Sequence, residues 1–191
     1  MFIEPHISNK GWIEVVCGSM FSGKTEELIR RLRRVEIANQ KVSIYKPATD
    51  TRYDATDIVS HNASSISSIP VPHSTSILLH PNEVQVVAID EAQFFDDELP
   101  SVCEQLAQKG IRVIVAGLDM DFLGQPFGCM PQLLCVADYV TKLHAICMVC
   151  GDLATHSFRK TTEGNQILLG EKDIYEARCR QCYWDGRNEQ E

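Results

Sequence analysis

An eight-residue segment, Gly18–Thr25, restricts the fold of this chain more than any other feature of the sequence. It reads GSMFSGKT and fits the pattern G-x-x-x-x-G-K-[ST] at every fixed position. Glycines let the backbone curl so that its N–H groups point inward at phosphate oxygens, and a helix that begins at Lys24 directs its positive dipole end to the same place. An apolar strand pattern, Trp12–Cys17, precedes the segment and a helical pattern follows it. A turn that binds nothing is the alternative, but this context favours a phosphate-binding loop between a strand and a helix.

The two side chains that end this loop have expected roles toward a nucleoside triphosphate. Lys24 would reach the β and γ phosphates, and the hydroxyl of Thr25 would ligate Mg²⁺. A second Mg²⁺ ligand is expected where a neighbouring strand leaves the sheet, and Asp90 follows the apolar run Val86–Ile89. Glu91 would point to the other side of that strand, so it is the candidate general base, unless the two acids form a solvated pair. If Glu91 is not the base, the substitutes are Asp119 and Asp121.

Residues 1–143 alternate short apolar runs with helical stretches, a pattern typical of a sheet flanked by helices. The expected strands are Trp12–Cys17, Lys41–Tyr45, Val84–Asp90, Ile111–Leu118 and Tyr139–Leu143. Several of them are apolar on both faces, as central strands of a parallel sheet are. This part of the chain is therefore predicted to be a P-loop α/β domain of the RecA-like kind.

Two helices and one long connection are expected within this domain. The helix after Thr25 would place four arginines on a solvated face, with a binding patch as the alternative: Arg30, Arg31, Arg33 and Arg34. A second helix is expected over residues 99–107, where apolar side chains recur at helical spacing and Gly110 follows as a stop. Residues 50–82 are rich in Ser, Pro, Asp and His, so they are expected to form long connections with short strands near Ile58 and Ile69.

Composition and charge limit the class of partner. Eighteen basic against 26 acidic residues give a net charge of −8 and a pI near 5.2. Proteins that bind a nucleic-acid backbone typically carry an excess of basic residues, so this balance argues against such a partner. A cradle of backbone amides binds anions without a basic surface, so this acidity is compatible with a phosphate ligand. No apolar run approaches the roughly 18 to 20 residues that cross a bilayer, and residues 1–11 lack the pattern of a signal peptide. A cytoplasmic protein with neither nucleic-acid nor membrane partners is expected.

The eight cysteines fall into two groups. Cys147 and Cys150 form one C-x-x-C pair, and Cys179 and Cys182 form another after the 28 residues 151–178. Two such pairs are typical of a zinc ribbon, and four thiolates leave no open coordination position, so the zinc would be structural. Redox chemistry is the competing interpretation, although a thioredoxin-like motif would not come paired. The remaining cysteines are expected to pack in the α/β core: Cys17, Cys103, Cys129 and Cys135.

The alternating pattern stops after Leu143, which is the expected domain boundary. Residues 1–143 would form the nucleotide-binding domain, and residues 144–191 would form a zinc-binding lasso. The loop between the cysteine pairs is pinned at its base, which suits a lid over a site. The polar tail after Trp184 is expected to be frayed.

Taken together, these motifs resemble those of the type II, zinc-containing thymidine kinases. The segments that carry the resemblance are GSMFSGKT, DTRY at 50–53, AIDEAQFF at 88–95, GLDMDFLGQPFG at 117–128, and CMVC with CRQCY around the last loop. They occur in order over nearly the whole chain. The resemblance implies transfer of the γ-phosphoryl group of ATP to the 5′-hydroxyl of thymidine or deoxyuridine, by a homotetramer.

The resemblance also implies the residues of the site. Glu91 matches the carboxylate that takes the hydroxyl proton, and Asp90 matches the acid on the Mg²⁺ side. The implied ATP site comprises Gly18, Ser19, Met20, Phe21, Ser22, Gly23, Lys24, Thr25, Asp50, Thr51, Arg52, Asp90, Glu91, Ala92 and Gln93. The implied nucleoside site comprises Met20, Phe94, Phe122, Phe127, Ser157, Gln166, Ile167, Leu168, Leu169, Gly170 and Tyr175. Residues 166–170 would read the base largely through backbone groups, and without the resemblance the aromatic residues would be core residues by default.

Two other functions are open to a chain with these motifs. An ATP-driven nucleic-acid protein would couple the phosphate loop to a zinc ribbon that holds DNA or RNA, and the acidic pI argues against it. A non-catalytic nucleotide-sensing module would need neither Glu91 nor an aromatic pocket. A nucleoside kinase is therefore the preferred prediction.

Overall fold

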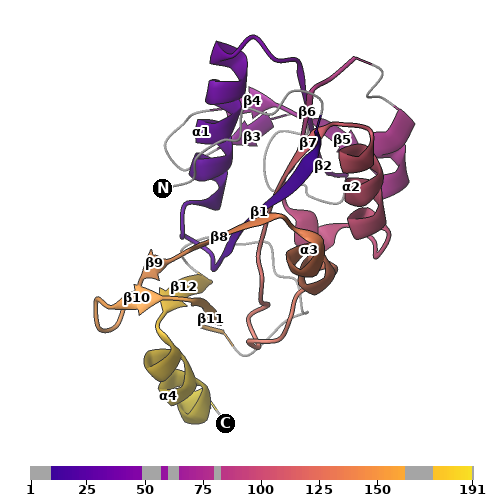
Figure 1. Cartoon of the computed structure of the whole chain (residues 1–191). Coiled ribbons are helices and arrows are strands. Elements are labelled where there is room, and N and C mark those ends of the chain that lie inside the picture. Colours follow the sequence, from indigo (N-terminus) through magenta and orange to yellow (C-terminus); the bar gives the residue numbers. More distant parts are fainter. Residues whose placement is uncertain (1–9, 49–56, 60–64, 80–82, 162–173, 191) are drawn as a thin grey trace.

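A six-stranded parallel sheet forms the centre of the molecule (Figure 1). The computed structural model describes residues 10–48, 57–59, 65–79, 83–161 and 174–190. The strands lie in the order β5-β2-β6-β7-β1-β8, and every neighbouring pair is parallel. They are β1 (Trp12–Gly18), β2 (Val42–Pro47), β5 (Ile69–Val71), β6 (Val86–Ile89), β7 (Arg112–Gly117) and β8 (Tyr139–Leu143). The predicted α/β class with a parallel sheet is confirmed.

Helices cover both faces of the sheet, which explains why its central strands are apolar on both sides (Figure 1). Helix α1 (Lys24–Ile37) buries Leu28 and Leu32 against one face. On the other face, α2 (Leu99–Gln108) and α3 (Met130–Val136) pack with the 3₁₀ helices η1 (Ser74–Leu79) and η2 (Ala92–Phe94). Helix α2 was expected from its apolar spacing, whereas α3 has only seven residues and is too short to show a period.

The chain after β8 forms a smaller body beside the end of the sheet where β1 runs into α1 (Figure 1). Its elements are β9 (Ala145–Ile146), β10 (Leu153–Ala154), β11 (His156–Arg159), β12 (Tyr175–Arg178) and α4 (Arg180–Gln190). We call the described part of this body, residues 144–161 and 174–190, the ribbon. Its buried apolar cluster consists of Ala145, Cys147, Ala154 and Ala177. A short hairpin of β3 (Asp57–Val59) and β4 (Ser65–Ser67) completes the described elements.

One predicted solvated arginine is in fact buried. Arg31 is 1% exposed, and its guanidinium binds Glu14 at 2.7 Å, Glu27 at 2.9 Å and the Thr141 hydroxyl at 2.9 Å. Arg112 binds the same Glu14 carboxylate at 2.7 Å. The prediction was wrong because Glu14, a charged residue inside an apolar strand pattern, requires buried cations to compensate its charge. This network ties α1 to β1, β7 and β8.

Two further predictions about side-chain exposure and order were also wrong. Cys135 is exposed, because it lies on the outer side of α3 while its neighbour Leu133 packs inward. The tail after Trp184 is helical as far as Gln190, because α4 packs Tyr183 and Gly186 against the ribbon. The other core cysteines are buried as predicted, and burial raises the pKa of Cys17 to about 11.

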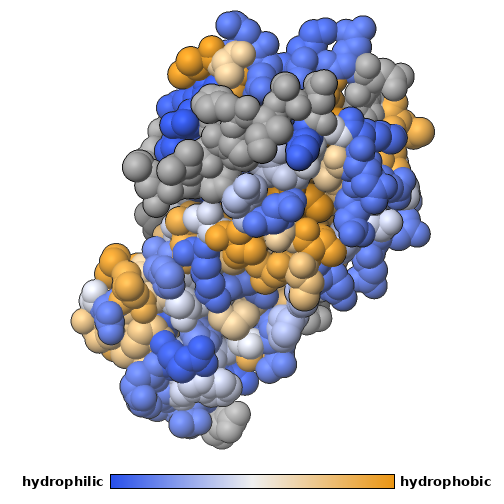
Figure 2. Space-filling model, in the orientation of Figure 1, coloured by the Kyte–Doolittle hydropathy of each residue, from blue (hydrophilic) through white to orange (hydrophobic). Residues whose placement is uncertain are grey.

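Exposed apolar side chains gather on the β9–β10 hairpin of the ribbon (Figure 2). They are Ile146, Met148, Val149 and Leu153. In the described part of the chain, no helix has the length and apolarity that a bilayer crossing requires.

Candidate active site

The loop between β1 and α1 has the geometry of an anion-binding turn. Gly18 and Gly23 have φ angles of 145° and 86°, and Phe21 also has a positive φ, 64°. A Cβ on Gly18 would lie 2.3 Å from the backbone oxygen of Leu143, so β8 approaches the loop too closely for any side chain there. Within the described residues, the buried hydroxyls of Ser19 and Ser22 have no hydrogen-bond partner, and phosphate oxygens would supply one.

Lys24 begins α1 and lies among carboxylates. Its Nζ donates a hydrogen bond to the backbone oxygen of Ser19 at 2.8 Å, which folds the side chain back over the loop. Burial lowers the pKa of Lys24 below its ordinary value, while the nearby charges of Glu91, Asp90 and Asp119 act in the opposite direction. The loop, the lysine and the acids therefore meet at the same edge of the sheet.

Asp90 and Glu91 follow β6 directly, as predicted from the sequence. Asp90 is 7% exposed, and one of its carboxylate oxygens accepts a hydrogen bond from the backbone N–H of Glu91 at 2.9 Å. The predicted reason for the orientation of Glu91 was wrong, because the strand ends at Ile89 and strand alternation no longer applies. Glu91 instead has a left-handed backbone, with φ 52° and ψ 41°. The turn into η2, and not the strand, sets the direction of its side chain.

The two residues after Glu91 are buried. Ala92 is fully buried and Gln93 is 3% exposed. The Gln93 side chain donates a hydrogen bond to a Glu91 carboxylate oxygen at 2.5 Å and accepts one from the backbone N–H of Leu118 at 2.9 Å. Gln93 thus contacts the candidate base, which sequence reasoning had not indicated.

The two alternative bases are engaged differently from Glu91. A carboxylate oxygen of Asp119 pairs with Lys142 Nζ at 2.6 Å. Asp121 accepts hydrogen bonds from the backbone N–H groups of Leu123 and Gln125, both at 2.9 Å, so it shapes its own loop. Asp121 therefore resembles a turn-forming residue, and Asp119 lies beside the phosphate loop as an ion-paired acid.

The predicted aromatic residues come from η2 and from the loop between β7 and α3. The rings of Phe94 and Phe127 meet edge to face with centroids 5.5 Å apart, and both are partly buried. The Phe122 ring is covered on one face by the guanidinium of Arg159, whose central carbon lies 3.8 Å from the ring centroid. Phe94 and Phe127 are thus brought together, while Phe122 is held by the ribbon.

The ribbon contacts the phosphate loop and the Phe122 loop directly. The Ser157 hydroxyl accepts a hydrogen bond from the backbone N–H of Met20 at 3.0 Å, and Phe21 packs on the apolar cluster of the ribbon. Tyr183, fully buried in α4, donates a hydrogen bond to the backbone oxygen of Phe122 at 2.8 Å. Sequence reasoning missed Tyr183, although its place directly after Cys182 was a usable signal.

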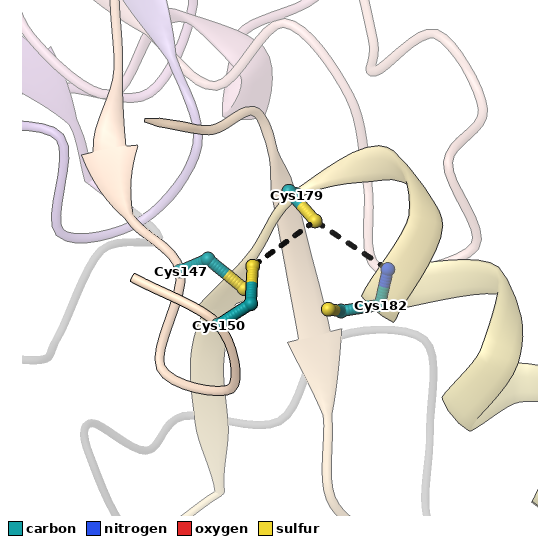
Figure 3. A group of neighbouring side chains, drawn as sticks. All are labelled: Cys147, Cys150, Cys179 and Cys182. Carbon is teal, nitrogen blue, oxygen red and sulfur yellow. Dashed lines mark hydrogen bonds between the residues drawn. The ribbon is translucent and has the colours of Figure 1, made fainter. Parts of the chain in front are cut away.

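Four cysteine sulfurs converge at the base of the ribbon (Figure 3). Cys147 and Cys150 lie on the turn between β9 and β10, and Cys179 and Cys182 lie where β12 runs into α4. All four sulfurs lie within 4.8 Å of one another, and those of Cys150 and Cys179 are 3.7 Å apart. Four sulfurs at about 2.3 Å from one tetrahedral ion would be separated by roughly 3.8 Å. The donor set therefore fits a closed tetrahedral metal site.

Local hydrogen bonds prepare one of these thiols for metal binding. Burial acts to raise the pKa of Cys147, but backbone N–H groups of Cys179, Cys150 and Val149 outweigh it and lower the pKa to about 6. The neighbouring Cys179 sulfur and burial raise the pKa of Cys182 to about 12. Four thiolates this close repel one another, so all four cysteine thiols can lose their protons together only when a cation is bound among them.

Some predicted site residues lie outside the described part of the chain: Asp50, Thr51, Arg52, Gln166, Ile167, Leu168, Leu169 and Gly170. Tyr175 is described, and it lies buried on β12 opposite Arg159.

Comparisons with known proteins assign the chain to a family. A family model described as thymidine kinase matches residues 11–183. A thymidine kinase of Bacteroides thetaiotaomicron is 59% identical over 192 residues, which cover 99% of this chain and 96% of that protein. A thymidine kinase of Bacteroides fragilis is also 59% identical, over 96% of this chain and 94% of that protein. Among solved structures, the flagellar accessory protein FlaH of Methanocaldococcus jannaschii matches 76% of each chain at 14% identity and a TM-score of 0.48, a similarity too low to carry an argument. The family model and the two close relatives agree: this chain belongs to the thymidine kinase family.

Proposed function

We propose that this protein transfers the γ-phosphoryl group of ATP to the 5′-hydroxyl of thymidine, and also of deoxyuridine, to give the nucleoside monophosphate. Membership of the thymidine kinase family supports the reaction. The observation that carries the proposal is the meeting of Lys24, Asp90 and Glu91 at one edge of the sheet, beside a loop shaped for an anion. A nucleotide sensor would not require a carboxylate at position 91, and the net charge of −8 argues against a nucleic-acid motor.

In the proposed reaction, the Glu91 carboxylate takes the proton from the 5′-hydroxyl. The 5′-oxygen forms a bond to the γ-phosphorus, and the bond from that phosphorus to the β–γ bridging oxygen breaks, which releases ADP. A protein catalyses phosphoryl transfer mainly by positioning the reactants and by neutralising the charge on the phosphates. Lys24 and the backbone N–H groups of Gly18–Thr25 would neutralise the developing phosphate charge.

Mg²⁺ is the expected companion of the triphosphate, and the residues present fit it. Asp90 offers a nearly buried carboxylate and Thr25 offers a hydroxyl in the first turn of α1, and both are the hard oxygen donors that Mg²⁺ prefers. When bound, the ion would neutralise charge on the β and γ phosphates. Arg52, together with Asp50 and Thr51, remains a predicted addition to this part of the site.

The nucleoside is proposed to bind between the phosphate edge and the ribbon. Phe94 and Phe127 supply apolar ring surfaces for a pyrimidine, and Phe122 would extend this wall. Residues 166–170 are proposed to read the base through backbone groups. Ser157 already binds the backbone of Met20, so its contribution would be to hold the phosphate loop against the ribbon.

The cysteine cluster is proposed to hold one structural Zn²⁺. Four sulfur donors leave no open coordination position, so the ion would stabilise the ribbon without taking part in the chemistry. We further propose two domains, residues 1–143 and 144–191, in a cytoplasmic homotetramer that binds neither nucleic acid nor membrane.

A nucleoside panel assayed with Mg-ATP tests the proposal. Thymidine and deoxyuridine should be phosphorylated, and deoxycytidine and uridine should be poor acceptors, because backbone groups matched to one pyrimidine edge leave other bases with unpaired groups. Glu91→Gln should lower turnover by about 10²- to 10⁴-fold while ATP binding survives. The matched control is Glu104→Gln, on the exposed face of α2. Failure to phosphorylate any nucleoside would overturn the proposed function.

A further inference from the structure

We propose that Gln93 is a positioning residue that holds the Glu91 carboxylate in place for proton abstraction. The inference deepens the proposed function and rests on Glu91 as the base. Its starting observation is the 2.5 Å hydrogen bond that the Gln93 side-chain nitrogen donates to a Glu91 carboxylate oxygen. A hydrogen bond to an ionised carboxylate is shorter and stronger than a bond between neutral groups.

The orientation of the Gln93 amide is dictated by its second partner. The backbone N–H of Leu118 can only donate, and it lies 2.9 Å from the amide oxygen of Gln93. The amide nitrogen must therefore face Glu91, where it can only donate. Gln93 thus links the end of β7 to the carboxylate and presents a donor that cannot rotate away without leaving the Leu118 N–H unpaired.

The surroundings of Gln93 are built to hold this side chain. A Cβ on Gly117 would lie 2.9 Å from the Gln93 amide oxygen, and a Cβ on Gly128 would lie 2.3 Å from the Gln93 backbone oxygen. Both glycines therefore leave room that Gln93 fills. At 3% exposed, the amide is shielded from water, so its two hydrogen bonds cannot be exchanged for solvent at low cost.

Glu91 needs such support because of its backbone. A non-glycine residue with φ 52° is strained, and such conformations persist only where the surrounding structure determines them. The backbone N–H of Glu91 binds Asp90, and the backbone N–H of Phe94 binds the Glu91 oxygen at 3.1 Å. These bonds fix the main chain, while the bond from Gln93 fixes the reacting end of the side chain.

Two substitutions separate this role from a purely structural one. Gln93→Glu keeps the shape and the acceptor for Leu118 but replaces the neutral donor with a second carboxyl group that must share a proton with Glu91. Gln93→Met loses both hydrogen bonds. We expect each variant to lower kcat by about 10- to 100-fold, the size expected for one charge-assisted hydrogen bond. KM for ATP and for thymidine should stay within about twofold, because the bond acts on the reacting group and not on substrate binding. Gln105→Glu, on the exposed face of α2, is the control for the added charge.

The double variant Glu91→Gln with Gln93→Met, which brings no new carboxylate to the site, completes the experiment. It is performed on the whole chain with zinc supplied, and thermal unfolding checks that each variant folds. If Gln93 acts through Glu91, the second substitution should add less than about twofold to the loss caused by the first. The inference is overturned if Gln93→Glu keeps both the wild-type kcat and the wild-type pH profile of kcat while Gln93→Met does not, since Leu118 would then be the only partner that matters. The inference is also overturned if the substitution of Gln93 lowers kcat by the same factor in the Glu91→Gln protein as in the wild type. If Glu91→Gln itself keeps full turnover, the proposed base is wrong, which is a different result from the failure of Gln93 alone.

Discussion

The phosphate edge of the sheet and the ribbon are stabilised by different means. The sheet carries large apolar clusters on both faces, with side chains such as Leu28, Leu106 and Ile114 fully buried. The ribbon is much smaller, and besides a cluster of three alanines and Cys147 it buries the rings of Phe158, Tyr175 and Tyr183. Units of about 40 residues or fewer rarely bury enough apolar surface to offset their conformational entropy, and they usually need a metal or disulfides. The comparison indicates that the ribbon would be stable only with the metal that we propose for its four cysteines, whereas apolar burial on both faces stabilises the sheet.

The two regions are nevertheless joined at the proposed substrate site. The backbone of Met20 binds Ser157, and the backbone of Phe122 binds Tyr183. An ordered ribbon should therefore support nucleoside binding from one side, while Lys24 and Glu91 act from the other. Each prediction below changes one region and measures both.

Cys147→Ser should produce the largest effect. Removing one thiolate breaks the tetrahedral site, and structural zinc contributes on the order of 10 to 16 kcal/mol to folding in small ribbons. Hydrogen exchange should show amides of β11, β12 and α4 losing protection, while those of β1, β6 and β7 keep it. Cys135→Ser is the matched control, because Cys135 is exposed on α3 and is not one of the four clustered cysteines. Continued protection of the ribbon without metal would remove the distinction between the two regions.

Arg31→Met tests the sheet side of the comparison. The substitution leaves Glu14 buried with one fewer cation, and breaking a buried ion pair costs about 3 to 5 kcal/mol, with the lower value expected here because Arg112 remains. Chemical denaturation should show this loss, and zinc content should stay at the wild-type level. Arg30→Met, whose guanidinium is half-exposed, should cost less than about 1 kcal/mol. A wild-type midpoint for the Arg31 variant would mean that α1 is held to the sheet by its apolar face alone.

Tyr183→Phe tests the link between the regions with a smaller change. It removes one hydroxyl and therefore the hydrogen bond to Phe122, which is worth about 1 kcal/mol. We expect KM for thymidine to rise about fivefold with kcat and zinc content unchanged. Trp184→Phe, which keeps an aromatic ring beside Tyr183, serves as the control. A fall in kcat with constant KM would show that α4 acts on the phosphate edge and not on the nucleoside site.

The sequence was sufficient for the features that repeat or carry fixed spacing. Apolar runs located the sheet strands, and Gly18–Thr25 and the paired cysteines located two clusters that the structure brings together. Features that depend on contacts across the fold could not be derived. Arg31 looked like a surface residue because nothing along the chain reveals that Glu14 lies beneath it. Gln93 and Tyr183 bind residues on other elements, so their partners become visible only once the chain is folded.

His156 gives the smallest effect and the one that depends on pH. Its ring stacks on Tyr183 with centroids 4.5 Å apart, and burial, Arg180 and Lys142 lower its pKa, while Asp119 acts in the opposite direction. The unfolded chain takes up a proton near pH 6.5, whereas the folded ribbon takes it up only at lower pH. The unfolded state then binds more protons, so this residue makes the ribbon less stable as the pH falls below about 6.5. His156→Phe keeps the stacking and removes the titration, so the unfolding midpoint of the variant should fall less between about pH 7.5 and about pH 5.5 than that of the wild type. Protonation of the cysteine ligands acts equally on both proteins, so an identical fall in the two would assign all the acid sensitivity of the ribbon to its metal site.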